Sequence, residues 1–180
     1  SYNVFVRTQP EVQITTQKPA QACERTPFAI QSTSLFSDNK VTWTRLNGSD
    51  GSIDNASAEN ISYQHGLQDS ANKGAYLKVT TVPIDNDVCP PASDSIEIIL
   101  HQYPVLTPLT QQTGCVPLTT TWLAEENKGI PVNQLVYRWD FGNGDTSNLQ
   151  NPSATYNQQG KYDVSLTVVN TAGPCAATIS

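Results

Sequence analysis

Residues 135–141 read Leu-Val-Tyr-Arg-Trp-Asp-Phe, and residues 142–145 continue with Gly-Asn-Gly-Asp. Every second residue of the first stretch is apolar, beginning at Leu135, which is the pattern of a β-strand with one face in a core. The Asn143-Gly144 pair follows at once and predicts a hairpin, because such a pair tolerates positive φ at low cost. The stretch therefore predicts a strand that ends in a tight turn.

A second alternating stretch begins at Tyr162. The side chains of Tyr162, Val164, Leu166 and Val168 share one face of the predicted strand. Two alternating strands joined through turns predict a small antiparallel β-sandwich, and not an enzyme fold.

This segment resembles the PKD (polycystic kidney disease) domain. The resemblance rests on the Trp-Asp-Phe-Gly-Asn-Gly-Asp run, on the later Asn-Pro and Ala-Thr-Tyr, and on Gly-Lys-Tyr-Asp-Val-Ser-Leu-Thr-Val, and it spans most of residues 104–180. The motif and core positions in this half are Trp139, Asp140, Phe141, Gly142, Gly144, Tyr156, Gly160 and Tyr162. The family usually has Asp where this chain has Asn143, which weakens the case for an acidic metal cluster in the turn.

A similar order of features occurs in the first half of the chain. Trp43 lies in an alternating stretch, a Gly- and Asp-rich turn follows at residues 47–52, and a later strand is expected at residues 75–80. We expect Trp43 and Trp139 to be equivalent core residues, since a mid-strand Trp is the hub of Ig-like sandwiches. This half resembles the divergent PKD-like units of Bacteroidota surface proteins, although it lacks the Trp-Asp-Phe-Gly motif and has a longer approach, through residues 64–74, to its later strand.

The predicted fold is all-β, with two tandem Ig-like (PKD-type) antiparallel β-sandwich domains at residues 1–103 and 104–180. The join is placed in the proline-containing segment 102–108, which we expect to be a short, semi-extended linker. Residues 1–9 are either the terminal strand of a preceding repeat or the first strand of this domain. The last residues, 176–180, resemble a final strand cut short.

The composition limits the partners. The chain has 10 basic and 16 acidic residues and a formal charge of -6, whereas nucleic acids and anionic membranes select basic surfaces. No stretch approaches the roughly 18 apolar residues that span a bilayer. We expect no nucleic-acid partner and no membrane insertion. Charged residues make up only 14%, as in many secreted β-proteins.

The four cysteines fall two in each half of the chain. Cys23 and Cys89 would bracket the first repeat, and Cys115 and Cys175 the second. Of the three possible connectivities we favour these two bonds within the halves, which imply an oxidising, extracytoplasmic location. Four reduced thiols are the alternative. Zinc is disfavoured, because the chain has no Cys-x-x-Cys pair.

Few residues could carry chemistry. Asp85 and Asp87 are candidates for calcium, which some PKD modules bind near domain junctions, but calcium needs about six or more oxygens and this run supplies too few. We therefore expect no cofactor, with calcium as the open alternative. His65 and His101 lack a nucleophile motif, so no catalytic centre is predicted. Trp122 could stack on a sugar if exposed, or lie partly buried at a strand edge.

These observations predict a non-catalytic structural and adhesive repeat segment of a large secreted cell-surface protein. The resemblance to PKD arrays points to the stalk of a gliding-motility-type adhesin, with neighbouring repeats, surface polysaccharide or another cell-surface protein as partners. The alternative is a spacer or carbohydrate-binding accessory module of a secreted hydrolase.

Overall fold

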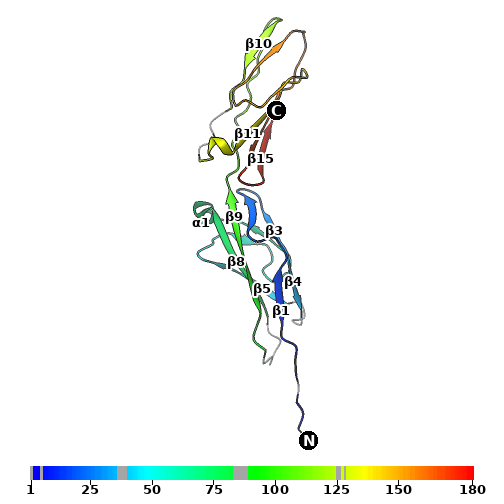
Figure 1. The fold of residues 1–180 in the computed structure, drawn as a ribbon, viewed down its shortest axis with the longest axis vertical. Helices are drawn as coiled ribbons and strands as arrows, with labels where there is room; N and C mark the ends of the chain where they lie inside the picture. The colour runs from blue at the N-terminus through cyan, green and yellow to red at the C-terminus, as the bar shows by residue number, and fades with distance from the viewer. Residues whose placement is uncertain (1, 5, 36–39, 83–88, 125–126, 128) are drawn as a thin grey trace. The chain divides into compact units, whose positions relative to one another are not determined.

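The computed structural model describes residues 1–180 except 1, 5, 36–39, 83–88, 125–126 and 128. It divides into two compact units, Ser1–Leu100 and His101–Ser180. Both are built almost wholly of antiparallel strands (Figure 1). The predicted all-β fold class is confirmed, while the domain bounds at residues 103 and 104 stay a prediction.

The first unit contains two facing layers of strands. One layer is a sheet with the order β2-β9-β8-β5, and the other comprises the pair β1-β4 and the sheet β3-β7-β6. The strands are β1 (Glu11–Ile14), β2 (Ala20–Cys23), β3 (Phe28–Ile30), β4 (Ser32–Leu35), β5 (Val41–Leu46), β6 (Ser52–Ile53), β7 (Ile61–Gln64), β8 (Gly74–Thr81) and β9 (Ser93–His101). A short helix, α1 (Leu67–Asn72), lies beside β8 (Figure 1).

Alternate side chains of the strands point inward and form the core of the first unit. In β8 every second side chain is buried, and Ala75, Leu77 and Val79 have no exposed surface. Trp43 in β5 is 3% exposed, and its indole N–H donates to the carbonyl of Ala58 at 2.9 Å. Trp43 is therefore a core residue, as predicted.

Asp94 in β9 connects the two layers of the first unit. One of its oxygens accepts the N–H of Ile14 in β1 at 2.8 Å, and Lys18 Nζ lies 2.6 Å from both oxygens. Burial raises the pKa of Asp94, but the Lys18 and Ile14 hydrogen bonds outweigh it and hold that pKa below its usual range. The ionised carboxylate therefore stabilises the attachment of β1.

We expect Asp94→Asn to lower the free energy of unfolding of the first unit by about 1 kcal/mol at pH 7, because Lys18 is partly solvated. A depressed folded-state pKa contributes stability above the unfolded value of about 3.9, which is lost as the pH falls through the folded value. The difference between wild type and variant should shrink below about pH 4. Urea unfolding at pH 7 and pH 3 measures it, and a difference that does not change with pH would contradict the assignment.

The second unit also has two layers. A sheet with the order β12-β11-β14-β15 faces the pair β10-β13. The strands are β10 (Leu118–Thr121), β11 (Leu135–Asp140), β12 (Thr146–Ser147), β13 (Ser153–Tyr156), β14 (Ser165–Asn170) and β15 (Cys175–Ile179), and a 3-10 turn, η1 (Val132–Gln134), precedes β11. As predicted, Leu135, Tyr137, Trp139 and Phe141 are buried. The second predicted strand begins only at Ser165, and Tyr162 precedes it.

The same three-stranded arrangement recurs in the two units. In the first, β8 lies between β5 and β9, and in the second, β14 lies between β11 and β15. Trp43 pairs with Val79 across β5 and β8, and Trp139 pairs with Leu166 across β11 and β14. The repeat inferred from the sequence therefore has an equivalent set of strands in each unit.

Residues 102–109, which begin with the expected linker, pack against the second unit. Pro104 is fully buried, and Leu106 lies against the core of that unit. The carbonyl of Gln102 accepts a hydrogen bond from the Asn170 side chain at 3.0 Å. Part of the expected linker therefore packs on the second unit, while the placement of the domain join within residues 102–108 stays a prediction.

The N-terminal residues precede the first strand. β1 begins at Glu11, and the described residues before it, 2–4 and 6–10, lie outside any strand. Pro10 is buried, whereas Tyr2, Val4 and Val6 are almost fully exposed. Residues 1–9 are thus not the first strand of this unit over their described positions.

Candidate functional site

The turn between β11 and β12 contains most of the family motif. The Asp140 carboxylate accepts the Gly142 N–H at 2.9 Å, and Asn143 Oδ1 accepts the N–H of Asp145 at 3.0 Å. Asn143 Nδ2 donates in turn to Asp145 Oδ2 at 2.9 Å. The polar side chains of the motif are therefore engaged in holding the turn, as in other Asx turns.

Gly142 and Gly144 have the conformation that the turn requires. Their φ angles are 71° and 93°, in the left-handed region that favours glycine. A Cβ on Gly142 would also lie 2.7 Å from the carbonyl oxygen of Asp163. Gly160 is different, because a Cβ there would make ordinary contact with the Tyr162 ring at 3.6 Å.

The aromatic motif residues form the core of the second unit. Trp139 and Phe141 are each 2% exposed, with ring centroids 6.2 Å apart, and the Trp139 indole donates to the carbonyl of Leu149 at 3.0 Å. The ring of Tyr156 packs on that of Tyr162 at 4.6 Å. Burial raises the pKa of the Tyr156 hydroxyl. All of these side chains have packing contacts within the second unit.

Trp122 belongs to the same core. It is 7% exposed, and its ring centroid lies 6.2 Å from that of Trp139. A buried indole cannot offer a face to a sugar ring. The alternative of a sugar-stacking Trp122 is therefore wrong, and the indole is more deeply buried than the partly buried edge residue that was the other expectation.

A buried carboxylate in the first unit was not predicted from the sequence. Asp69 in α1 has no exposed surface, and its oxygens accept the Tyr63 hydroxyl at 2.5 Å and the N–H groups of Gly51 and Gly66 at 3.1 and 3.0 Å. Burial and the neighbouring Asp69 raise the pKa of Tyr63 far above its usual value. We call Asp69, Tyr63, Gly51 and Gly66 the carboxylate network; it holds β7, α1 and the turn before β6 together.

Asp50 fixes the start of α1 next to this network. Its carboxylate accepts the N–H groups of Gln68 and Asp69 at about 3 Å. The Gln68 N–H is the largest of several backbone donors that lower the pKa of Asp50 despite its partial desolvation. An ionised carboxylate at the start of a helix satisfies amides that have no partner within the helix. The network and Asp50 are thus structural and offer no open coordination site.

The calcium candidates cannot be placed. Asp85 and Asp87 lie outside the described residues. Among the residues that are described, no group of three or more His, Cys, Asp or Glu side chains converges on one point.

His65 accepts the Arg25 N–H at 2.6 Å, and burial lowers the pKa of His101. These contacts show the histidines in packing and hydrogen-bonding roles.

The predicted disulfide pairing is wrong. Cys23 and Cys175 are disulfide-bonded, whereas Cys89 and Cys115 carry thiols. Cys175 begins β15 and is fully buried, while Cys115 lies exposed ahead of β10. The bonds predicted between Cys23 and Cys89 and between Cys115 and Cys175 assumed that sequence position within a repeat brings sulfur atoms together. A disulfide requires suitable Cα distances and directions, which spacing does not give.

We expect an alkylating reagent to label Cys115 in the unreduced native protein and to leave Cys23 and Cys175 unlabelled. The reason is that an exposed thiol can form the reactive thiolate, while disulfide sulfur cannot. Peptide mass mapping before and after reduction measures this. Labelling of Cys23 without reductant would contradict the assignment, and a Cys115→Ser variant is the control.

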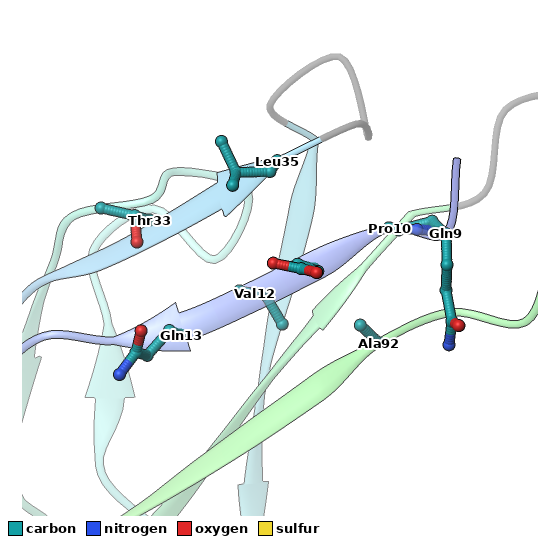
Figure 2. Close-up of a pocket in the computed structure, with 8 residues that line it drawn as sticks. Gln9, Pro10, Val12, Gln13, Thr33, Leu35 and Ala92 are labelled. Atoms are coloured by element: carbon teal, nitrogen blue, oxygen red, sulfur yellow. The ribbon is translucent and has the colours of Figure 1, made fainter. Parts of the chain in front are cut away.

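One groove on the first unit is large enough to consider as a binding site. It has a volume of about 510 Å³ and runs along β1 and β4 (Figure 2). Its lining residues are Gln9, Pro10, Glu11, Val12, Gln13, Thr33, Leu35 and Ala92. One carboxylate among amides and apolar groups supplies neither the ligand set of a metal nor an acid and base pair. This groove has no catalytic composition.

The described residues also contain no helix long and apolar enough to cross a membrane. The fold class is all-β, with several antiparallel sheets.

Comparison with known protein families identifies a family for part of the chain. Residues 101–180 match the family model described as PKD domain. These residues include the motif turn and the whole strand set β10–β15. The resemblance inferred from the sequence is therefore confirmed for this part.

Solved structures give only distant similarity. The D00-D0 domain of intimin is 10% identical with a TM-score of 0.37, and covers 95% of this chain and 96% of that one. Rst D1-D2 is 11% identical with a TM-score of 0.39 and coverages of 93% and 97%. Mouse cadherin-23 EC22-24 is 13% identical with a TM-score of 0.35 and coverages of 95% and 66%. Nothing about the function of this chain follows from these values.

Proposed function

We propose that this chain is a non-catalytic structural and adhesive repeat segment of a large extracellular cell-surface protein. The observation that carries the proposal is the match of residues 101–180 to the PKD domain, together with the use of that family's motif residues in the core and the turn. The disulfide-bonded cysteines add support, because such bonds persist in oxidising compartments outside the cytoplasm.

The proposal describes each unit as a stiff element whose antiparallel ladders resist extension. Repetition of such elements produces an elongated stalk, and neighbouring repeats of the same chain are its first partners. At the stalk's exposed surface the further partners are a surface polysaccharide or another cell-surface protein.

No cofactor is part of this role, and calcium titration of wild type and an Asp85→Ala, Asp87→Ala double variant tests that expectation.

The finer proposal is a gliding-motility adhesin of the Bacteroidota, of the kind represented by SprB. The sequence resemblance of the first half to Bacteroidota PKD-like units motivates it. In that role, tandem units carry an adhesive surface away from the cell and move along it.

The test is to raise an antibody against this chain and apply it to intact cells of the source organism. We expect labelling of intact cells that disappears after protease treatment of the cell surface, and weaker attachment of cells in which the gene is deleted. Labelling only after the cells are opened would overturn the proposal. A catalytic domain in the same polypeptide would favour the alternative, a spacer in a secreted hydrolase, and binding on a glycan array would favour an accessory carbohydrate-binding module.

A further inference from the structure

We propose that Asn47 is a site of spontaneous chemical modification, at which the side-chain amide cyclises onto the main chain and is replaced by aspartate or isoaspartate. The pair Asn-Gly occurs twice in this chain, at residues 47–48 and 143–144. Because the two pairs have the same local chemistry, a large difference between their reaction rates must come from the fold. The site is separate from the adhesive role proposed above.

The reaction needs only water and the two residues of the pair. The glycine amide nitrogen gives up its proton to hydroxide and attacks Cγ of the asparagine, so that a C–N bond forms, the Cγ–Nδ2 bond breaks and ammonia leaves. Water then opens the resulting succinimide ring. Cleavage at Cγ gives aspartate, and cleavage at the main-chain carbonyl gives isoaspartate. Nothing is oxidised or reduced, and glycine hinders the ring closure least because it has no side chain.

The turn at Asn47 leaves the reacting groups accessible. Asn47 and Gly48 are both exposed, with φ angles of 53° and 78°. The turn is closed by one backbone hydrogen bond, from the Ser49 N–H to the Leu46 carbonyl at 3.0 Å. The Asn47 side chain has no hydrogen bond to any residue that the structure describes, and no heavy atom lies within 4 Å of a Cβ built on Gly48. Opening of this one turn is therefore enough to bring Cγ onto the glycine nitrogen.

The same pair at residues 143–144 is held in place. Asn143 Oδ1 accepts the Asp145 N–H at 3.0 Å. Asn143 Nδ2 donates to Asp145 Oδ2 at 2.9 Å and to the Thr155 carbonyl at 3.3 Å. The side chain is also half-buried. Rotation of Cγ toward the Gly144 nitrogen must break these hydrogen bonds first, so we expect the ring to close more slowly here.

The residues that follow Asn47 give the modification a structural consequence. Ser49 Oγ accepts the N–H of Tyr76 in β8 at 2.9 Å, and the Asp50 carboxylate accepts the N–H of Gln68 at the start of α1 at 3.1 Å. Isoaspartate in place of Asn47 adds one carbon to the main chain just before these two contacts. We therefore expect α1 and the start of β8 to loosen when the site reacts.

The experiment is incubation of the native protein in mildly alkaline buffer, followed by peptide mass mapping over time. We expect Asn47 to lose its amide nitrogen about tenfold faster than Asn143. In guanidinium chloride the two rates should become similar, because the unfolded chain no longer holds Asn143. Equal rates in the native protein would overturn the proposal, and so would a difference that persists after unfolding.

An Asp145→Ala variant tests the protection of Asn143. It removes the acceptor of Asn143 Nδ2 at an exposed position and should raise the rate at Asn143 severalfold, while the rate at Asn47 stays unchanged. Slow hydrogen exchange in β11 shows that the second unit is still folded. A rate at Asn143 as slow as in wild type would show that these hydrogen bonds do not explain the difference between the pairs.

The Asn47→Asp variant separates the added charge from the longer main chain. We expect amide hydrogen exchange at Gln68 and Tyr76 to accelerate about tenfold in the isoaspartate product, purified by chromatography, and to stay close to wild type in Asn47→Asp. Unchanged exchange in the isoaspartate product would overturn the structural consequence. Equal acceleration in the variant and the product would assign it to the charge and would also overturn it.

Discussion

Replacing Asp69 by alanine is expected to lower the free energy of unfolding of the first unit by about 3 kcal/mol. The side chain is fully buried, and the change leaves the Tyr63 hydroxyl and the N–H groups of Gly51 and Gly66 without their acceptor. A buried donor without a partner loses its hydration and gains nothing in return. Urea unfolding followed by hydrogen exchange at β7 and β8 measures the effect.

Two further variants test whether the network is the cause. Tyr63→Phe removes only the hydroxyl and should cost about 1 kcal/mol. Glu11→Ala changes an exposed carboxylate in the same unit and should stay within about 0.5 kcal/mol of wild type. An Asp69→Ala variant as stable as Glu11→Ala would show that the network contributes nothing to folding.

The second large effect is expected at Trp139. Trp139→Ala should lower the free energy of unfolding of the second unit by about 4 kcal/mol, because it leaves a cavity among buried aromatic rings. The indole contacts both Trp122 and Phe141 and also donates a hydrogen bond to Leu149. Hydrogen exchange resolved by unit is the measurement, and exchange in β14 should accelerate while exchange in β8 stays unchanged.

Val136 provides the matched control for Trp139. It lies in the same strand, on the opposite face, and is 37% exposed. Val136→Ala should change the stability of the second unit by less than about 1 kcal/mol. If the two variants were equally stable, Trp139 could not be the centre of this core.

Local pattern was sufficient to predict the strands that face the cores. The alternation at residues 135–141 and the Asn143-Gly144 turn both appear in the structure as predicted, because side-chain direction along a strand depends only on the adjacent residues. The helix at residues 67–72 was not predicted, because its sequence, Leu-Gln-Asp-Ser-Ala-Asn, has no apolar face that a local pattern could show. Its position is fixed instead by Asp50 and the carboxylate network, which are contacts between residues distant in the sequence.

The cysteines and Trp122 show where sequence position was insufficient. The spacing of the four cysteines suggested two bonds within the halves, yet Cys23 and Cys175 are the bonded residues and Cys115 is exposed. The sequence left open whether the Trp122 side chain is exposed or buried. Its contact with Trp139 shows that it is buried. Each outcome depends on residues that are distant in the sequence.

The sequence by itself determined the all-β class, the internal repeat and the PKD resemblance of the second half. These follow from periodicity and from turn residues, which act over a few neighbouring positions. Only the tertiary structure decided which cysteines are bonded and that Asp69 is a buried acceptor. Those features arise because burial and pairing depend on which segments meet in space.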